Sequence, residues 1–435
     1  MPATPIGRLV AALVLFLAWP NAHAVLTVKI TQGMEGASPI AVVPFQWQGA
    51  TAVPPERFHE IIASDLQRSG RFRPLPAADM PATPHTGAAI DFADWRRLGM
   101  DNVVVGRLEA EPGGRYRVEF QLFDVYKGVQ LAGYSIPAAG EDLRRTAHHI
   151  SDIIYQKLTG ERGAFATYIA YVTESTDARG ERVYALEVAD SDGANPQTLL
   201  SSRQPIMSPA WSPDGRRLAY VSFETGASAV YVQEVKTGER ERVSAREGIN
   251  SAPAWSPDGR HLALTLSKDG NPEIYTLGLA DATLRRLTRH GAIDTEPNWS
   301  PDGRHIVFTS DRGGRPQIYR VPAAGGEPVR VTFEGDYNAR PRYSPDGERL
   351  AMVHGLKGAY HVAIMDLATG SLRILSDSAL DETPSFAPNG SMVIYATNDA
   401  SGAILAAVSV DGRTRQRLSV QTGRVREPAW SPFIE

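Results

Sequence analysis

The chain of 435 residues contains no cysteine. This absence excludes disulfide bonds, thiolate nucleophiles and thiolate metal sites. Neither sign of charge is in large excess. The chain has 45 Lys and Arg residues and 49 Asp and Glu residues, which gives a formal net charge of −4. A chain with this balance has no general attraction to nucleic acid, so we expect no nucleic-acid partner. The hydrophobic fraction of 42% is typical of a soluble globular protein.

The sequence also lacks a hydrophobic run long enough to span a membrane. The apolar run over residues 9–19 has only eleven residues, whereas a membrane-spanning helix needs about 20. Arg8 precedes this run and a small-x-small site ending at Ala24 follows it, which is the order of a secretory signal peptide. The sequence therefore predicts a signal peptide over residues 1–24, a mature N-terminus at Val25, and export without direct insertion into a membrane.

A phrase of the form Pro-x-aromatic-Ser-Pro-Asp-Gly recurs six times in the second half of the chain, with the last copy truncated. Its aromatic residues are separated by 43 or 44 residues and are Trp211, Trp255, Trp299, Tyr343, Phe386 and Trp430. A period of about 40–45 residues is the length of one four-stranded propeller blade. Ser, Pro and Gly at this spacing favour a tight turn, so each copy should end one strand and begin the next. We expect the aromatic residues to pack one blade against another.

The two ends of the repeat predict how the ring closes. Residues 168–172 match the second strand of a blade, but no copy of the phrase precedes them. The missing first strand is present at the C-terminus, in residues 428–432. We therefore predict six blades, the first built from both ends of the domain, which leaves no open sheet edge at the closure.

Residues 25–163 show no such repeat and alternate between predicted strands and helices. Apolar residues at helical spacing predict helices over residues 56–69 and 141–158. Predicted strands lie at residues 40–43, 102–109, 116–126 and 129–136. The fold class is therefore an α/β N-terminal domain (25–163) followed by an all-β six-bladed β-propeller (164–435) closed by the C-terminal strand. Residues 25–34 precede the first predicted element, and an edge strand and a mobile tail both stay open for them.

No catalytic pattern accompanies these domains. The sequence has no Gly-x-Ser-x-Gly elbow and no phosphate-binding loop. His148 and His149 are adjacent on a predicted helix and point about 100° apart, so we do not expect them to bind a metal together. Residues 190–193 (Asp-Ser-Asp-Gly) lack the distant Glu of a calcium loop and are better explained as a tight turn. An enzyme acting in the channel, a hydrolase or a lyase, is the alternative class.

The loops that enter the first strand of each blade differ between the repeats, and function usually resides in such loops. They include residues 250–252, 294–296, 338–340, 381–383 and 426–427. In a propeller these loops gather around one mouth of the central channel. The sequence predicts that these loops form a polar docking surface. Two other possibilities stay open: the loops could surround a calcium ion at the centre of the channel, or they could be ordinary solvated loops.

Several segments together closely resemble the TolB family, the periplasmic component of the Tol–Pal system of Gram-negative bacteria. They are residues 39–45, the Trp-Ser-Pro-Asp-Gly repeats, residues 309–319, residues 380–384 and residues 428–432. The resemblance covers essentially all of the mature chain. It implies a monomeric, non-catalytic periplasmic adaptor without a cofactor, which supports outer-membrane integrity, invagination during cell division and protein import. Its implied partners are the lipoprotein Pal and the inner-membrane protein TolA, and other outer-membrane lipoproteins stay open.

The resemblance also implies where these partners bind. Pal would contact the loops before the first strands of two blades, at Ile249, Asn250, Ser251, Ala252, Asp294, Thr295 and Glu296. TolA would bind the mature N-terminal segment, residues 25–34, at Val25, Leu26, Thr27, Val28, Lys29, Ile30 and Thr31. Pal in the propeller mouth would order or reposition this segment.

Overall fold

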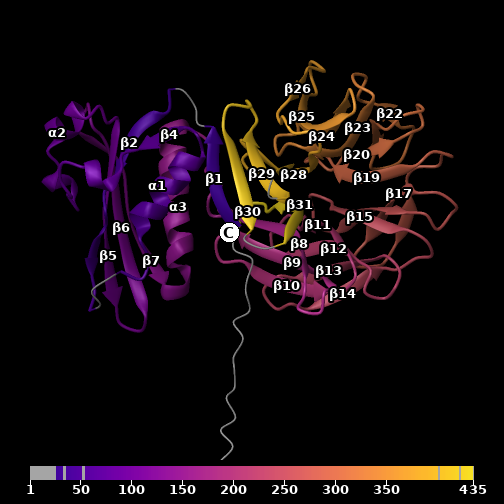
Figure 1. Cartoon of the computed structure of the whole chain (residues 1–435), viewed down its shortest axis with the longest axis horizontal. Helices are drawn as coiled ribbons and strands as arrows, with labels where there is room; N and C mark the ends of the chain where they lie inside the picture. Colours follow the sequence, from indigo (N-terminus) through magenta and orange to yellow (C-terminus); the bar gives the residue numbers. More distant parts are fainter. Residues whose placement is uncertain (1–25, 33–35, 51–53, 400–401, 421–422, 435) are drawn as a thin grey trace, which may run out of the picture.

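The computed structural model describes residues 26–434 except 33–35, 51–53, 400–401 and 421–422. These residues form an α/β domain and a six-bladed β-propeller (Figure 1), which confirms the predicted fold class. The predicted signal peptide and Val25 lie outside the described residues. Among the helices that are described, none has both the length and the hydropathy needed to cross a membrane.

The α/β domain is built on one mixed sheet with the strand order β4-β2-β5-β6-β7, and β3 pairs with β5. The pairs of β2 with β4 and with β5 are parallel, and the remaining neighbours along the order are antiparallel. Its strands are β2 (Ser38–Val42), β3 (Gln46–Gln48), β4 (Phe72–Pro74), β5 (Asn102–Glu111), β6 (Arg115–Asp124) and β7 (Val129–Ala139). Its helices are α1 (Phe58–Arg68), α2 (Phe92–Arg97) and α3 (Leu143–Thr159), with short 3₁₀ turns at Ala77–Asp79, Gly87–Ala89 and Gly140–Asp142.

Helices α1 and α3 pack together on one face of this sheet because their apolar residues recur at helical spacing. Ile62 and Leu66 of α1 and Ile150 and Ile154 of α3 are fully buried in a single core with strand β6. Helix α3 ends at Gly160, whose φ of +82° allows its N–H to bond the carbonyl of Gln156 at 2.9 Å. Both helices lie where the sequence predicts them, whereas α2, β3 and β4 are too short to give a clear periodic signal.

The propeller consists of six antiparallel four-stranded blades. The first three blades contain β31 (Arg424–Trp430), β8 (Tyr168–Thr176), β9 (Arg182–Asp190) and β10 (Gln197–Ser202); β11 (Ile206–Trp211), β12 (Arg217–Ser222), β13 (Ala229–Glu234) and β14 (Arg240–Ser244); and β15 (Asn250–Trp255), β16 (His261–Leu266), β17 (Glu273–Gly278) and β18 (Leu284–Arg286). The others contain β19 (Asp294–Trp299), β20 (His305–Ser310), β21 (Gln317–Pro322) and β22 (Val329–Arg330); β23 (Tyr337–Tyr343), β24 (Arg349–Leu356), β25 (Ala359–Asp366) and β26 (Leu372–Ile374); and β27 (Glu382–Phe386), β28 (Met392–Asp399), β29 (Gly402–Ser409) and β30 (Arg415–Val420).

The first blade contains strands from both ends of the domain, as the repeat predicts. Strand β31 pairs with β8 from Arg424, opposite Glu174, to Trp430, opposite Ile169. Just beyond this ladder, Tyr168 and Ser431 exchange two further hydrogen bonds, because Tyr168 N–H donates to Ser431 Oγ and Ser431 N–H to Tyr168 O, both at 2.9 Å. The last strand of the chain therefore closes the ring.

The repeated aromatic residues join neighbouring blades. The indole N–H of Trp211 donates to the carbonyl of Ala429 at 3.0 Å, and that of Trp255 donates to the carbonyl of Ala210 at 3.0 Å. Each acceptor lies on the first strand of the preceding blade, immediately before that blade's own Trp. The predicted role of these residues in packing between blades is therefore confirmed for these positions.

A fifth strand extends the last blade. Strand β1 (Leu26–Gln32) pairs antiparallel with β30, with Leu26 opposite Val420 and Gln32 opposite Arg415. In Figure 1, β1 accordingly lies beside β30 between the two domains. Of the two structures that the sequence leaves open for this segment, the edge strand is the one observed, and it belongs to the propeller rather than to the sheet of the α/β domain.

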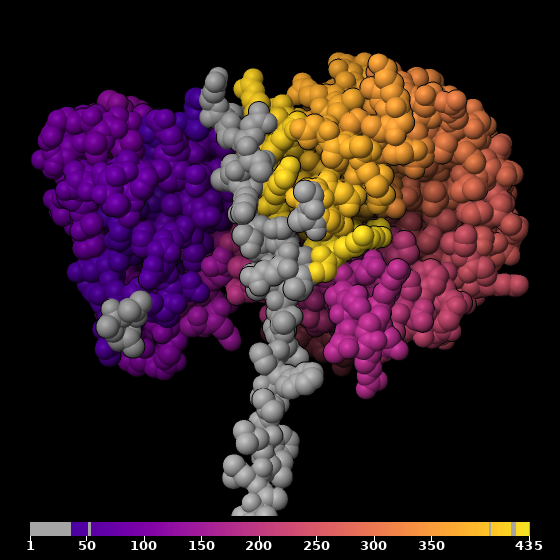
Figure 2. Space-filling model, viewed as in Figure 1, coloured from indigo at the N-terminus to yellow at the C-terminus, as the bar shows by residue number. Residues whose placement is uncertain are grey.

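The two domains form separate lobes, and the first and last blades are the parts of the propeller that border the α/β domain (Figure 2). The contacts between the domains involve Asp190, which ends β9, the next residue Ser191, and Asn389, which follows β27. These turns lie at the blade ends opposite the start of the inner strands. The mouth of the propeller therefore faces away from the α/β domain.

Candidate functional site

Every blade has the same unusual backbone feature where its innermost strand enters the channel. One residue that is not glycine adopts a left-handed conformation directly before a proline, and the pairing register shifts at that point. These residues, with φ between 49° and 57°, are Ser208, Ala252, Glu296, Arg340, Thr383 and Glu427. A conformation of this kind costs about 1–3 kcal/mol and persists where the surrounding structure imposes it. Its repetition in all six blades makes it part of how the channel is built.

These bulges bring charged side chains together inside the channel. Arg340 Nε lies 3.0 Å from Glu296 Oε1, and Arg340 Nη1 lies 3.4 Å from Glu427 Oε1 and also donates to Thr383. Burial would lower the pKa of Arg340, but attraction to Glu427 and Glu296 outweighs it and raises this pKa. The two carboxylates thus already have a guanidinium between them, and the half-buried Arg342 adds a second cation. This arrangement does not fit a calcium ion held by Glu296 and Glu427.

The predicted Pal-contacting residues lie at the starts of two neighbouring inner strands, β15 and β19. Both strands meet at Thr265, whose hydroxyl lies 3.4 Å from Thr295 Oγ1 and accepts the N–H of Glu296 at 3.3 Å. Ser251, Ala252, Thr295 and Glu296 are half-buried. The structure therefore brings the two predicted segments together at one mouth of the channel.

Two residues of this set, Asn250 and Asp294, are fully buried. The side-chain oxygen of Asn250 accepts hydrogen bonds from Ser244 Oγ at 2.7 Å and from the N–H of Arg246 at 2.8 Å. Asp294 Oδ2 pairs with Arg312 at 2.6 Å, and burial raises the pKa of this carboxyl. These side chains stabilise the loops from within, so their effect on a partner has to be indirect.

Several large apolar side chains are exposed at the mouth, among charged neighbours such as Glu247 and Asp336. Ile249, Ile293 and Leu380 are 45%, 50% and 45% exposed, and each stands three residues before the left-handed residue of its blade. Further exposed apolar residues occupy the neighbouring loops at the same end of the blades. Together we call this set the mouth rim; it comprises Ile249, Ile293, Phe333, Leu356, Tyr360 and Leu380.

Contacts between loops of adjacent blades hold part of the mouth rim in place. The N–H of Tyr360 donates to the carbonyl of Ala379 at 3.0 Å, and Tyr360 pairs in parallel with Leu380. The rings of Tyr360 and Tyr337 meet edge to face at 5.1 Å. Of this rim only Ile249 is among the residues predicted from the sequence, because the other predicted residues of these loops are mostly polar. The signal that would have revealed it is an apolar residue three positions before the left-handed residue, shared by Ile249, Ile293, Tyr337 and Leu380.

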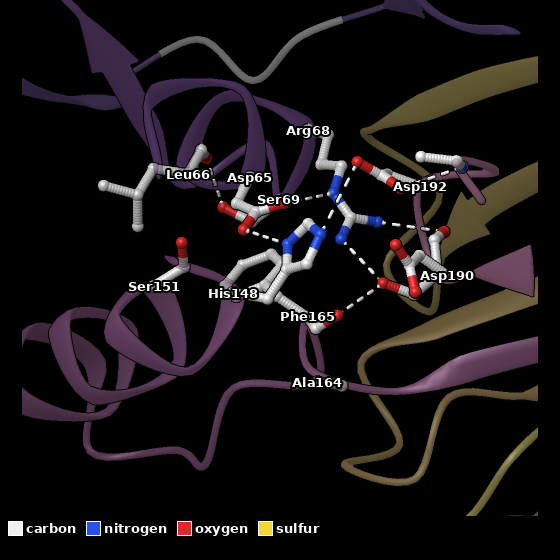
Figure 3. Close-up of polar contacts among 12 residues, drawn as sticks. Asp65, Leu66, Arg68, Ser69, His148, Ser151, Ala164, Phe165, Asp190 and Asp192 are labelled. Carbon is white, nitrogen blue, oxygen red and sulfur yellow. Dashed lines mark hydrogen bonds and ion pairs between the residues drawn. The ribbon is translucent and has the colours of Figure 1, made fainter. Parts of the chain in front are cut away.

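A second concentration of polar side chains lies between the domains (Figure 3). Arg68 of α1 donates to the carbonyl of Ser191 at 3.1 Å and to its hydroxyl at 2.8 Å. Arg144 of α3 pairs with Asp190 at 3.2 Å and also with Asp192. Residues 190–193 form the predicted tight turn, closed by a 2.7 Å bond from Gly193 N–H to the carbonyl of Asp190. This turn joins the first blade to α1 and α3.

His148 stands at the centre of this interface, whereas His149 points to solvent. His148 Nδ1 lies 2.7 Å from Asp65 Oδ2, and Nε2 lies 3.7 Å from Asp192 Oδ2. The two histidines therefore do not share a site, as predicted. Asp65, His148 and Asp192 have the donor types of a metal site, but Arg68 and Arg144 already supply positive charge to both carboxylates.

Comparisons with known proteins agree with both domains. A family model described as the TolB amino-terminal domain matches residues 26–131, and one described as the TolB beta propeller domain matches residues 155–434. The chain is 65% identical over 429 residues to the Tol-Pal system protein TolB of Nitrosococcus oceani, covering 98% of each chain. It is 63% identical over 434 residues to that of Thioalkalivibrio sulfidiphilus, covering 99% of this chain and 100% of the relative. The crystal structure of TolB from Acinetobacter baumannii superposes with a TM-score of 0.87 at 43% identity, covering 94% of this chain and 100% of the other.

Proposed function

The chain belongs to the TolB family, a non-catalytic component of the Tol–Pal system, and we propose that it is a periplasmic adaptor between the lipoprotein Pal and TolA. Pal binds at the propeller mouth, and TolA binds the N-terminal segment, residues 25–34. Outer-membrane lipoproteins other than Pal are further candidates for the mouth. The alternative of a hydrolase or lyase in the channel is set aside, since the family is not enzymatic.

The single observation that carries the proposal is the mouth rim. Monomeric proteins rarely expose several large apolar side chains around one opening, and such surfaces mark sites where partners bind. Phe333 is 73% exposed, although an aromatic residue of this size usually finds cover in a folded protein. Charged groups at the centre of the mouth, Arg340 among them, add the specific polar contacts that orient a partner.

The position of β1 supports a connection between the two binding sites. Its first residue, Leu26, lies opposite Val420, the residue that ends β30 at the mouth side of the last blade. A Pal molecule seated on the mouth would therefore lie near the start of the N-terminal segment. While this segment pairs with β30, its backbone groups on that side are not available to TolA. A partner that stabilises the paired state thus opposes TolA binding, because the two states of the segment have different affinities.

The role of the adaptor in the cell follows from these two partners. A protein that exchanges between an outer-membrane lipoprotein and an inner-membrane protein supports outer-membrane integrity and the invagination of the envelope during cell division, and the same site is open to imported proteins. We propose that the chain acts as a monomer. We also propose that it needs no cofactor in the channel, because Arg340 and Arg342 together balance the charges of Glu296 and Glu427 there.

Affinity capture from an envelope extract tests the proposal. Mature protein beginning at residue 25 is immobilised beside a variant that carries Ile249→Asp and Ile293→Asp in the mouth rim. Capture of an outer-membrane lipoprotein by the first protein and not by the second supports the adaptor. Equal capture by both, or turnover of a peptide or glycan by the mature protein, contradicts it.

A further inference from the structure

Around His148, the charges of Asp65, Arg68, Arg144, Asp190 and Asp192 are balanced only when the imidazole carries a proton. Three carboxylates, those of Asp65, Asp190 and Asp192, and the guanidinium of Arg68 surround the imidazole (Figure 3). The guanidinium of Arg144 pairs with Asp190 and Asp192. With a protonated imidazole the group holds three positive and three negative charges. With a neutral imidazole one negative charge stays uncompensated at a site from which water is largely excluded, and such a charge is costly.

The hydrogen bonds of the imidazole depend on the proton in the same way. His148 is only 2% exposed, and its Nδ1 is engaged by Asp65. A neutral ring that donates from Nδ1 has a lone pair at Nε2, and this lone pair faces the carboxylate of Asp192. Nε2 lacks any hydrogen-bond partner within the described residues. Only the imidazolium can donate toward Asp65 in its own domain and attract Asp192 in the other.

Every charged group that faces the imidazole comes from α1, from α3 or from the turn after β9. Asp65 and Arg68 lie on α1, and Asp190 and Asp192 lie at that turn. Arg144 lies one helical turn before His148 on α3. Asp152, one turn after it, accepts the backbone N–H groups of Phe165 and Ala166 at 2.7 and 3.2 Å, and burial raises its pKa to about 6.

We propose that His148 is a proton-dependent latch between the two domains. Its imidazolium attaches α3 to the β9–β10 turn of the first blade, and loss of the proton loosens that attachment. The α/β domain then becomes freer to move relative to the propeller. The latch works at the end of the blades opposite the mouth rim, so it regulates how the domains are held together and does not alter the partner surface itself.

The direction of the pH dependence follows from the environment of the imidazole. Burial by itself would lower the pKa of His148, but attraction to Asp65, its hydrogen bond with that residue and attraction to Asp192 together raise it. Asp65 lies in the same domain as His148 and raises this pKa whether or not the domains are docked, whereas Asp192 raises it only in the docked state. A histidine whose pKa is higher in the docked state strengthens docking below its undocked pKa, and this contribution is lost as pH rises through the docked pKa. The latch therefore opens as pH rises.

Hydrogen exchange of the mature protein between about pH 6 and about pH 9 tests the latch. After correction for the intrinsic exchange rate, amide exchange in α3 and in residues 188–197 should become faster as pH rises. The increase should be up to tenfold for each unit by which the pKa of His148 in the docked state exceeds its pKa in the undocked state. His148→Gln should remove this dependence and exchange fast at every pH. His149→Gln, which changes the exposed neighbour on the same helix, should behave as the unaltered protein.

An NMR titration of the imidazoles in the unaltered protein provides a second measurement that does not depend on any variant folding. The latch requires that His148 titrate at a higher pH than His149. A His148 that titrates with His149 or below it, or a His148→Gln variant with the same exchange profile as the unaltered protein, would overturn the proposal. Thermal stabilisation by added Zn²⁺ that His148→Gln abolishes would also overturn it, in favour of a metal site.

Discussion

The indole N–H of Trp430, on the last strand, donates to the buried hydroxyl of Thr167 at 2.9 Å, although the two residues lie 263 positions apart. Thr167 in turn donates to the carbonyl of Ala164 at 2.6 Å. The closing strand of the ring is thus tied to the segment that joins the two domains, in addition to its ladder with β8.

Removal of residues 428–435 should strongly destabilise the propeller. The deletion takes away the end of β31 and the bonds of Trp430 and Ser431, and it exposes the edge of β8. We expect a loss of about 5 kcal/mol or more, which lowers the Tm by about 10 °C or more. Differential scanning calorimetry measures this change. Trp430→Phe serves as the control, because it removes only the indole hydrogen bond and should cost about 1 kcal/mol. A truncated protein as stable as the full chain would contradict closure by β31.

Charged substitutions in the mouth rim should weaken the binding of Pal without unfolding the protein. Ile293→Asp places a charge on a half-exposed apolar side chain, and a central interface residue is worth about 2 kcal/mol or more. The Kd for the partner, measured by calorimetric titration, should therefore rise at least about thirtyfold. Val329→Asp is the matched control, since Val329 is 60% exposed on the outer strand β22. Equal losses in the two variants would argue against the mouth as the binding surface.

Substitutions of the buried loop residues should act on stability first. Asp294→Ala leaves Arg312 without its carboxylate partner beneath the loop, and the loss of one member of a buried pair costs about 3–5 kcal/mol. Thr295→Ala, at the neighbouring half-buried position, should cost about 1 kcal/mol or less. Urea denaturation of both variants measures the difference. A fully stable Asp294→Ala variant that no longer binds Pal would instead show direct contact.

Deletion of residues 25–34 should abolish the binding of TolA and leave the binding of Pal largely intact. The deletion removes β1, which only adds a fifth strand at the outer edge of the last blade, while the four strands β27–β30 stay in place. Surface plasmon resonance with each purified partner measures both affinities. Loss of both to the same extent would mean that the segment supports the fold of the mouth and is not a separate site.

The packing of α1 against α3 should weaken in acid, because Asp65 of α1 pairs with His148 of α3 within the same domain. Burial opposes ionisation of Asp65, but His148 and Arg68 outweigh it and lower the pKa of this carboxyl. A lowered pKa gives stability that is present above about pH 3.8 and lost as pH falls through the folded value. Asp65→Asn should therefore lower the Tm at pH 7 and make the Tm less dependent on pH below about pH 4. If the Tm of this variant falls in acid as steeply as that of the unaltered protein, Asp65 is not the origin of the fall.

The fold was largely predictable because its signals are local and repeated. Each Ser-Pro-Asp-Gly phrase specifies a turn within a few residues, and the 44-residue spacing then specifies the blades. The pairing of β1 with β30 was not predictable in this way, since it joins residues almost 390 positions apart and an exposed edge strand carries little pattern. The contact of His148 with Asp65 is equally hidden, because neither helix reveals which of its polar residues faces the other helix.

The sequence predicts where the candidate site lies better than it predicts which of its side chains are exposed. The loops around Asn250 and Asp294 do lie at the mouth, yet these two polar side chains turn inward to satisfy buried backbone and charged groups. The apolar Ile293 and Phe333 face outward instead. A sequence pattern that assigns polar residues to the surface fails where the surface is built to be covered by another molecule.

The pairing of β31 with β8 also determines when the propeller can fold. A chain that is synthesised and exported from its N-terminus delivers β8 early and β31 last, so the first blade stays one strand short until nearly the whole chain has emerged. During that interval β8 presents an unpaired edge, which is the kind of surface that chaperones bind and that proteases and aggregation exploit. The ring that needs no cysteine for its closure thus depends on protection during its biogenesis.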